Sequence, residues 1–153
     1  MFMNKTLWTY WHQGFDQAPL LIQCCVKQWA TLHPKWEIRK LDSNNIHDFL
    51  GHDFLAEESF AKLSLPHISD LIRTKLLIDY GGVWIDPTVF PVVPLEEWLD
   101  FNSEAGVFLF SRPGKDRLIA NWFIASRKNS RLLQSFSKMG QKLCTRLEKR
   151  KYK

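Results

Sequence analysis

The sequence predicts an α/β fold built on a mostly parallel sheet that is flanked by helices. Near the N-terminus, a strand pattern, a helix pattern and a second strand pattern follow one another within about 35 residues, which is the βαβ unit of a parallel sheet. Further along, a helical pattern breaks at Gly81-Gly82 and leads into Val83-Trp84-Ile85, which is too short and too apolar for anything but a buried strand. The chain has 153 residues, of which 45% are hydrophobic and 24% charged, so it can bury one core and is not disordered throughout.

The first strand is predicted from Lys5 to Trp11, a segment rich in aromatic and β-branched residues that His12-Gln13-Gly14 ends. Side chains alternate along a strand, so Trp8 and Tyr10 share one face of the sheet. Trp11 takes the other face, at the carboxyl end of the strand.

A helix is predicted from Pro19 to Leu32, because proline is favourable in the first helical turn and His33-Pro34 ends the pattern. A second strand follows from Trp36 to Leu41. Asp42 or Ser43 then suits the N-cap of a short helix.

The remaining segments are less regular. Gly51 to Ser64 is expected to combine a short helix with a loop, and Leu95 to Leu99 to form one helical turn. Gly106 to Ser111 reads as a strand, followed by a turn at Arg112-Pro113-Gly114. Leu118 to Ala125 is either a buried strand or the edge of a helix, which periodicity cannot resolve.

The helix before the glycine pair carries the first candidate functional residues. Apolar residues recur at helical spacing from Ile68 to Leu76, so one side is buried, while Asp70 and Arg73 lie on another stripe where charges at i and i+3 meet. The glycine pair suits a helix C-terminus. Asp86 then stands at the carboxyl end of a strand, where ligands bind in open α/β sheets. In a purely structural alternative, Asp70 and Arg73 form a surface ion pair, and Asp86 only begins a turn before Pro87.

This stretch, Ser69 to Phe90, resembles the sugar-binding region of glycosyltransferases with the GT-A nucleotide-sugar fold. The similarity is strongest to the capsular polysaccharide synthesis family and the related Och1-like mannosyltransferases. Their pattern is a Ser-Asp-x-x-Arg helix, then Tyr-Gly-Gly, then a strand that ends in Asp-x-Asp. The matching residues are Ser69, Asp70, Arg73, Tyr80, Gly81, Gly82 and Asp86. Thr88 stands in place of the second aspartate, as is familiar in the capsular branch.

The resemblance implies a GT-A-like sheet and a glycosyltransferase activity. The enzyme would move a sugar from a nucleotide-sugar donor to a saccharide or lipid-linked acceptor in surface or capsular polysaccharide biosynthesis, with retention of configuration by analogy to the Och1-like families. A divalent metal, Mn²⁺ or Mg²⁺, is implied as cofactor. A comparable Asn-Trp-Phe segment lies under the sugar site in the capsular family, which makes Asn121 and Trp122 candidates for acceptor contact.

The same resemblance suggests roles for individual residues. The strand-one motif of these families matches Trp8 to Gly14, so Trp11 would stack on the nucleotide base, whereas composition alone allows Trp11 to be a core residue. Asp70 and Arg73 would hold the sugar hydroxyls or the ribose of the donor. Asp86 would be the metal ligand, and Asp86 and Arg73 the catalytic residues.

Thr88 and the glycine pair complete the expected donor site. Thr88 would add a hydroxyl or a water contact, but it removes one negative charge and should weaken metal affinity. Gly81 and Gly82 would leave space for a ligand to approach closely. Thr88 and the short chain also suggest an alternative, a non-catalytic or degenerate nucleotide-sugar-binding protein.

The C-terminal segment carries the whole basic excess of the chain. Residues 127–153 contain ten Lys or Arg and one acid, giving +9, whereas residues 1–126 have eleven bases and fifteen acids, giving −4. Residues 1–126 are expected to form the nucleotide-sugar-binding α/β domain, and residues 127–153 a basic helix and tail of the same domain. The helical stripe comprises Leu132, Leu133, Phe136 and Met139. This helix either packs on the domain or lies on an anionic membrane surface. Nucleic-acid binding is not expected, because Tyr152 is the only aromatic residue among the last bases.

Cysteine usage and hydropathy predict a cytoplasmic protein. Cys24, Cys25 and Cys144 cannot all pair and lack metal-site spacing, so they read as reduced, packing thiols. No apolar run approaches the roughly 20 residues that span a bilayer, and the N-terminus lacks the apolar region of a signal peptide. The expected location is the cytoplasm, with peripheral contact at the inner membrane face.

Overall fold

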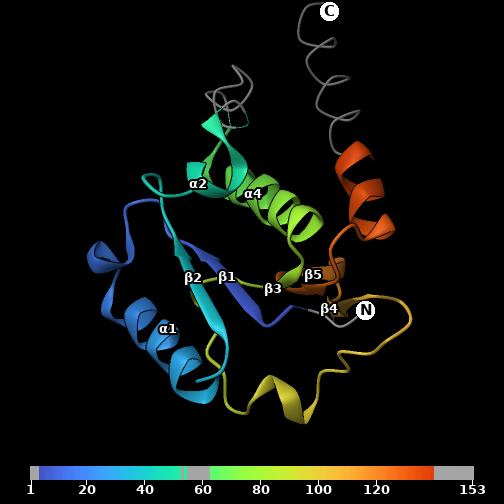
Figure 1. The fold of residues 1–153 in the computed structure, drawn as a ribbon, viewed down its shortest axis with the longest axis horizontal. Coiled ribbons are helices and arrows are strands. Elements are labelled where there is room, and N and C mark those ends of the chain that lie inside the picture. Colours follow the sequence, from blue (N-terminus) through green and yellow to red (C-terminus); the bar gives the residue numbers. More distant parts are fainter. Residues whose placement is uncertain (1–3, 53, 55–62, 140–153) are drawn as a thin grey trace, which may run out of the picture.

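A five-stranded sheet lies at the centre of the computed structural model, which describes residues 4–52, 54 and 63–139 (Figure 1). The strands are β1 (Thr6–Tyr10), β2 (Glu37–Leu41), β3 (Gly82–Ile85), β4 (Val107–Gly114) and β5 (Arg117–Ser126). Their order across the sheet is β2-β1-β3-β5-β4. β1 pairs in parallel with β2 and β3, whereas β5 is antiparallel to its neighbours β3 and β4. Four of the five strands therefore run in one direction, which confirms the predicted, mostly parallel α/β sheet.

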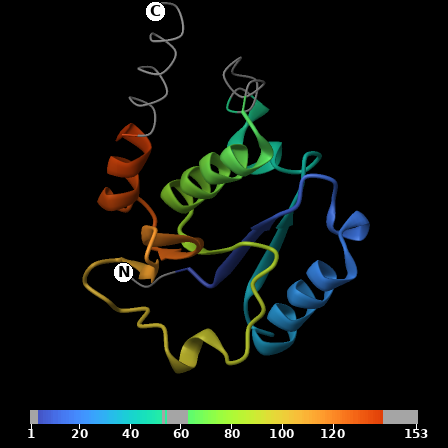
Figure 2. The same cartoon turned by 180° about the vertical axis from the view of Figure 1, so that it is seen from behind.

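Helices cover both faces of the sheet (Figures 1 and 2). α1 (Leu20–Leu32) lies on one face, and α4 (Leu65–Asp79) and the short α2 (His47–Leu50) lie on the other. On the α4 face the core contains Trp8, Tyr10, Leu41, Leu76 and Trp84. On the α1 face it contains Leu7, Trp29, Val83, Ile85 and Phe123. The alternation of side chains predicted for β1 is thus confirmed for Trp8 and Tyr10.

The N-terminal βαβ unit is confirmed within one or two residues at each boundary. Pro19 caps α1 rather than lying inside its first turn, and β1 ends at Tyr10. The cap predicted after β2 is present in part, because Asp42 Oδ1 accepts hydrogen bonds from the backbone amides of Asn44 and Asn45, at 2.7 and 3.1 Å. These residues form a turn, and α2 begins only at His47.

α4 ends at the glycine pair, as predicted. The Gly81 amide donates to the carbonyl of Leu77 at 3.1 Å, and Gly81 has φ +72°, the left-handed conformation that terminates many helices. β3 follows at once, and all four of its residues are buried. Only Tyr80 and Gly81 separate α4 from β3, so the helix lies close to the sheet.

His33 has a structural role beyond ending α1. It is buried, and its Nε2 accepts the amide proton of Leu95 at 2.9 Å, so its Nδ1 is the donor to the Trp29 carbonyl at 3.0 Å. The Trp29 indole donates in turn to the carbonyl of Val89 at 2.8 Å. These bonds fasten the segment after β3 to α1 and lead into the single turn η3 (Leu95–Glu97), which confirms the predicted helical turn.

The β4–β5 hairpin differs from the prediction. The turn expected at Arg112-Pro113-Gly114 is wrong, because β4 continues through Gly114 and the chain reverses at residues 115–116. The strand is irregular there, with register shifts between Leu109 and Gly114 and φ +49° at Arg112. The ambiguous segment from Leu118 is strand β5, since it pairs along both edges with β3 and β4.

The described part of the C-terminal segment is helical from 131 to 139. Leu133 is buried in the core of the α4 face, whereas Leu132, Phe136 and Met139 are exposed. The helix thus packs on the domain through one side only. Residues 140–153, which include Cys144 and most of the predicted basic tail, lie outside the described residues, as does most of the segment predicted as a helix and loop at 51–64. Within the described chain, no helix has the length and apolar character needed to span a bilayer.

Candidate active site

The candidate site lies at the carboxyl ends of the parallel strands. Trp8 of β1 is in register with Trp84 of β3, so the residues that leave these two strands, Trp11 and Asp86, emerge at the same edge of the sheet. The Asp86 amide donates to the carbonyl of Trp122 at 2.8 Å, which ties the end of β3 to β5. The predicted position of Asp86 at the carboxyl end of a strand is confirmed.

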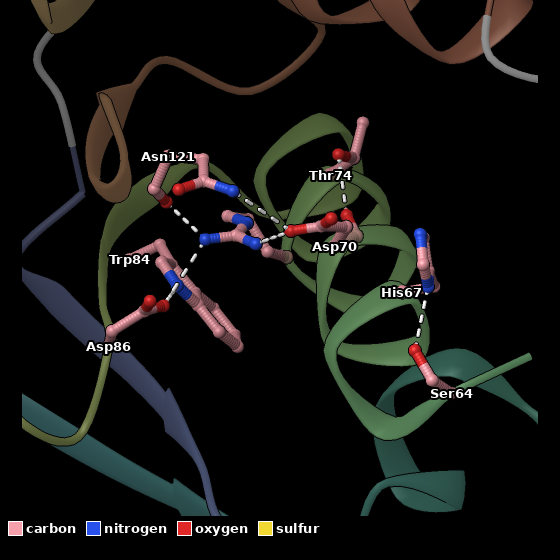
Figure 3. Close-up of polar contacts among 8 residues, drawn as sticks. Ser64, His67, Asp70, Thr74, Trp84, Asp86 and Asn121 are labelled. Carbon is pink, nitrogen blue, oxygen red and sulfur yellow. Dashed lines mark hydrogen bonds and ion pairs between the residues drawn. The ribbon is translucent and has the colours of Figure 1, made fainter. Parts of the chain in front are cut away.

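Asp70, Asp86 and Asn121, labelled in Figure 3, all accept hydrogen bonds from the guanidinium of Arg73. It lies on α4 and is only 3% exposed. Its Nη1 donates to Oδ1 of Asp86 at 3.2 Å and to the backbone carbonyl of Asn121, and its Nη2 donates to Oδ1 of Asp70. One buried guanidinium therefore joins two carboxylates and the middle of β5, which connects α4 to the end of β3 and to β5.

Trp84 also donates a hydrogen bond to the Asp86 carboxylate. Its indole Nε1 donates to Oδ1 of Asp86 at 2.7 Å, and the Arg73 guanidinium lies over the Trp84 ring at 5.3 Å from the ring centroid. Oδ1 of Asp86 thus accepts two hydrogen bonds, while Oδ2 has none from the described residues. The Asp86 side chain remains 33% exposed, so Oδ2 is the oxygen that a ligand can reach.

The charges of this cluster set its electrostatic character. Burial lowers the pKa of Arg73, and the nearby Asp86 carboxylate offsets part of that effect by raising it. An arginine side chain nevertheless stays protonated in proteins, so the cluster of Arg73, Asp70 and Asp86 carries a formal charge of −1. The half-exposed carboxylates face solvent while the cation is buried, which makes the site attractive to a cation or to hydroxyl groups.

The structure brings together three of the predicted site residues, Asp70, Arg73 and Asp86. Asn121, expected only as an acceptor contact, joins them because its side-chain amide donates to Oδ1 of Asp70 at 3.3 Å. Thr88 is exposed, in the turn that the hydrogen bond from the Val89 amide to the Asp86 carbonyl closes at 2.9 Å. Asp70 and the Asn121 amide thus lie near Asp86, and the exposed Thr88 lies two residues beyond it.

Trp11 lies at the end of the neighbouring strand and on the other face. It is half-buried and packs against the cluster of Phe15, Ala18, Ile22 and Val26 at the start of α1. This position is compatible with stacking on a nucleotide base and with core packing, since core residues cover part of the ring and part is accessible.

The structure corrects the role predicted for Gly81 and Gly82. Both are buried at the amino end of β3, the opposite end from Asp86. A Cβ on Gly82 would lie 2.6 Å from the carbonyl oxygen of Thr6, and one on Gly81 would lie 2.6 Å from the amide of Lys128. The expectation that these glycines leave space for a ligand is wrong, because the protein's own backbone fills that space.

Comparison with known proteins decides the family. Residues 1–149 match the family described as capsular polysaccharide synthesis protein. The chain belongs to this family. The predicted resemblance is thereby confirmed over almost the whole sequence.

Relatives of this family member include fungal proteins named as glycosyltransferases. It is 30% identical over 146 residues to glycosyltransferase afumC of Aspergillus fumigatus, an alignment that covers 83% of this chain and 37% of that protein. It is 27% identical over 160 residues to O-glycosyltransferase braB of Annulohypoxylon truncatum, covering 92% of this chain and 38% of that protein. The chain thus spans less than two-fifths of the length of these relatives.

The fold of this family member is also that of a solved glycosyltransferase. The PaToxG glycosyltransferase superposes with a TM-score of 0.62 at 15% sequence identity, covering 87% of this chain and 57% of that one. At this identity the similarity establishes a common fold. It agrees with the predicted GT-A-like architecture.

The residues at the edge of β3 are suited to a hard divalent cation. No group of three or more His, Cys, Asp or Glu side chains with metal-binding geometry occurs among the described residues. Asp86 Oδ2 and the exposed Thr88 hydroxyl are nevertheless oxygen donors of the kind that Mg²⁺ and Mn²⁺ prefer, and such ions commonly complete their shell with phosphate oxygens and water. The donor chemistry of Asp86 and Thr88 therefore fits the implied metal.

Proposed function

We propose that this family member is a glycosyltransferase that moves a sugar from a nucleotide-sugar donor to a saccharide or lipid-linked acceptor in surface or capsular polysaccharide biosynthesis, with retention of configuration. The observation that carries the proposal is the Asp86 carboxylate, which Arg73 and Trp84 hold through one oxygen and whose other oxygen accepts no hydrogen bond from any described residue. Relatives and a structural neighbour that are named as glycosyltransferases support the reaction class.

Donor binding would use the row of residues at the strand ends. Trp11 would stack on the base, and Asp70 with the Asn121 amide would accept and donate hydrogen bonds at the sugar hydroxyls. Arg73 is buried and already bonded to three groups, so its role would be to position Asp70 and Asp86 rather than to contact the donor. This differs from the expectation that Arg73 acts directly on the sugar.

The reaction breaks the bond between the anomeric carbon and the diphosphate oxygen, and the electron pair leaves with the diphosphate. Stabilising that charge is the main electrostatic task of the protein. A divalent metal held by Asp86, with Thr88 nearby, would supply this stabilisation when bound. The ion pair with Arg73 and the indole hydrogen bond from Trp84 would hold the Asp86 carboxylate in one orientation, so that little reorganisation is needed during transfer.

A panel of sugar nucleotides with Mn²⁺ tests the proposal. The chain should release nucleoside diphosphate from one donor when a saccharide acceptor is present, and Asp86→Ala should abolish the release. Asp79→Ala is the matched control, because Asp79 pairs with Lys75 at the far end of α4. Release that survives in Asp86→Ala would remove Asp86 from the mechanism, and no release from any donor would reject the transferase.

Thr88 favours a second candidate, a non-catalytic nucleotide-sugar-binding protein. With threonine at this position, Asp86 is the single carboxylate at the end of β3, which should weaken metal binding. Calorimetry separates the two functions. A non-catalytic binder would take up a donor with measurable heat and show no turnover with any acceptor.

We also propose a cytoplasmic location with peripheral contact at an anionic membrane surface. The exposed side of helix 131–139 presents Leu132, Phe136 and Met139, and Arg131 and Lys138 lie on the same helix. An apolar stripe flanked by bases suits the headgroup region of an anionic bilayer.

A further inference from the structure

The β4–β5 hairpin extends beyond the rest of the sheet at the edge where the candidate site lies. β5 pairs with β3 only over residues 123–126, whereas residues 117–122 continue past the end of β3. Within this overhang, the carbonyl of Asn121 accepts a hydrogen bond from Arg73 of the site. Arg117 lies further out, up to about 13 Å beyond Asn121 at the usual rise of a strand. The hairpin therefore stands directly beside the site.

Residues 111–119 form the projecting part of this hairpin, which we call the hairpin arm. All of them are exposed to solvent. A two-stranded hairpin gains little stability by itself, so the arm adds little to the core. The pairing of β4 with β5 shifts register between Leu109 and Ser111, where the arm leaves the sheet. Such irregularities are common beside active sites, because they redirect a strand. The arm is thus available for contact with a ligand.

The hairpin arm carries two cations that the rest of the structure does not neutralise. It contains three bases, Arg112, Lys115 and Arg117, and one acid, Asp116, so its formal charge is +2. Arg117 and Asp116 pair with each other, with Nη2 and Oδ2 2.8 Å apart. The side chains of Arg112 and Lys115 have no hydrogen bond or ion pair with any described residue. The arm therefore presents two uncompensated positive charges.

The backbone of Arg112 is not explained by stability. Its φ is +49°, in the left-handed region that residues other than glycine seldom adopt. Glycine would take this conformation without the steric cost that a Cβ brings. Unfavourable backbone conformations of this kind cluster at functional sites, where the side chain has a use that offsets the cost. A ligand contact therefore accounts for an arginine here better than the fold does.

The position of the arm relative to the donor indicates what it contacts. In the proposed function the diphosphate lies at Asp86 and the sugar next to Asn121, so the arm lies just beyond the sugar. An acceptor must touch that sugar. The site itself carries a formal charge of −1, and the diphosphate adds more negative charge, so an acidic acceptor would be repelled there without nearby cations. Arg112 and Lys115 would offset that repulsion.

We infer that the hairpin arm binds the acceptor, and that this acceptor is an acidic saccharide whose carboxylate pairs with Arg112 and Lys115. The inference rests on the proposed function and narrows its acceptor from saccharides in general to acidic ones. Arginine suits a carboxylate, because its planar guanidinium donates two parallel hydrogen bonds. Lysine adds a second charge on a flexible stem, which can follow the ligand.

Two oligosaccharides that differ in charge test this inference. The probes are tetragalacturonate and the neutral tetrasaccharide made by reducing its carboxyl groups, and calorimetry measures their affinities for the full chain. The wild type should bind the acidic probe at least about fivefold more tightly, the effect expected of two exposed ion pairs. The double variant Arg112→Gln with Lys115→Gln should bind the acidic probe about fivefold more weakly than the wild type and the neutral probe equally well.

A second double variant controls for the general attraction of a basic chain to anions. Lys27→Gln with Lys35→Gln removes the same charge from exposed positions on α1 and just after it. Its affinity for the acidic probe should equal that of the wild type. Equal losses in the two double variants overturn the inference, because they would show attraction without a site. A wild type that binds both probes equally overturns it too.

Arg112→Gly separates binding from folding. Glycine suits the φ of +49°, so the melting temperature should not fall, whereas the affinity for the acidic probe should fall about twofold to threefold. A structural role for the arginine would give the reverse result. A lower melting temperature with unchanged affinity for the acidic probe would therefore contradict the assignment.

Binding of UDP and GDP separates the acceptor contact from donor binding and from the proposed function. The arm variants should bind both nucleotides as the wild type does, and a parallel loss would assign the arm to the donor diphosphate and reject the acceptor contact. If the chain turns over a donor with a neutral acceptor and does not prefer the acidic probe, the proposed function stands and the inference is wrong. If the preference depends on the arm but no donor is turned over, the arm binds an acidic saccharide and the transferase is rejected.

Discussion

Trp84 and Asp86 are joined by a hydrogen bond of 2.7 Å from the indole nitrogen to the carboxylate; Trp84 lies on β3, and Asp86 directly follows that strand. Because alternate residues of a strand share a face, Trp84 lies directly behind Asp86 on the α4 face, where Arg73 covers its ring. The carboxylate is thus oriented by its own strand, independently of any loop.

Trp84→Phe should weaken metal and donor binding without unfolding the chain. Phenylalanine keeps an aromatic ring under Arg73 but removes the N–H donor, so we expect about a tenfold loss of Mn²⁺ affinity in a spectroscopic titration and a similar loss in donor turnover. Trp36→Phe is the matched control, since Trp36 also donates its indole N–H to a carboxylate, that of Glu96 at 2.6 Å, far from the site. Equal effects of the two variants would show that Trp84 has only a packing role.

Arg73→Met should be among the most destabilising substitutions in α4. It removes the buried cation from between Asp70 and Asp86 and leaves the Asn121 carbonyl without its donor. Because both carboxylates keep some contact with water, the expected loss is about 1–3 kcal/mol rather than that of a fully buried pair. Urea unfolding measures it, with Arg117→Met of the exposed pair with Asp116 as the control that should not change stability.

Gly82→Ala and Gly51→Ala separate backbone conformation from steric contact. Both glycines have positive φ, +99° and +72°, but a Cβ on Gly82 would lie 2.6 Å from the Thr6 carbonyl, whereas a Cβ on Gly51 would have no described residue within 4 Å. We expect Gly51→Ala to cost about 1 kcal/mol and Gly82→Ala at least about twice that. Similar melting temperatures for the two variants would contradict the close contact between β3 and β1.

Glu96 should make stability depend on pH in the acidic range. Burial raises its pKa, but hydrogen bonds from Trp36, its own amide and Lys5, together with the charge of Lys5, outweigh this, so its pKa lies below the ordinary value. A depressed pKa stabilises the fold above the unfolded pKa of about 4.3, and this contribution is lost as the pH falls through the folded pKa. Urea unfolding between about pH 3 and 6 should therefore show a shallower decline in Glu96→Gln than in the wild type.

Phe136→Ser should weaken binding to vesicles that contain anionic lipid. Phe136 is exposed on helix 131–139, so its loss should spare the fold while removing apolar area from the proposed contact. Binding of the full chain, measured by sedimentation, should also fall as salt is raised, because the attraction of the bases acts within about 10 Å at 0.1 M. Leu118→Ser, at a more exposed apolar position on the β4–β5 hairpin, is the control. Binding that is the same in both variants and the wild type would reject this surface.

The position of Asp86 could be predicted from the sequence because every determinant is local. The helix spacing of Asp70 and Arg73, the glycine break and the apolar run all lie within one stretch, and each restricts the backbone by itself. The indole bond to Asp86 was accessible to the same reasoning, since positions 84 and 86 must share a face of any strand.

Other contacts depend on segments that are distant along the chain. Asn121 reaches Arg73 only because β5 pairs antiparallel with β3. The apolar sequence of β5 predicts neither its neighbour in the sheet nor its direction. A glycine pair in the sequence is equally compatible with close approach of a ligand and with close approach of another backbone segment. Only the tertiary structure shows that the backbone of Thr6 and of Lys128 approaches Gly82 and Gly81. The turn expected at 112–114 was displaced for a similar reason, as pairing with β5 keeps those residues in the strand despite a proline.

The insertion of β5 also fixes the order in which the sheet can be assembled during synthesis. Among the strands that the structure describes, β5 is the last to leave the ribosome, yet it lies between β3 and β4 rather than at an edge. Until residues 117–126 are available, β3 presents a row of unpaired amides and carbonyls on one side, the kind of edge that recruits strands from other chains. A nascent chain that stalls before Ser126 is therefore exposed to aggregation, and closure of the sheet brings Asn121 to Arg73 in the same step that completes the core.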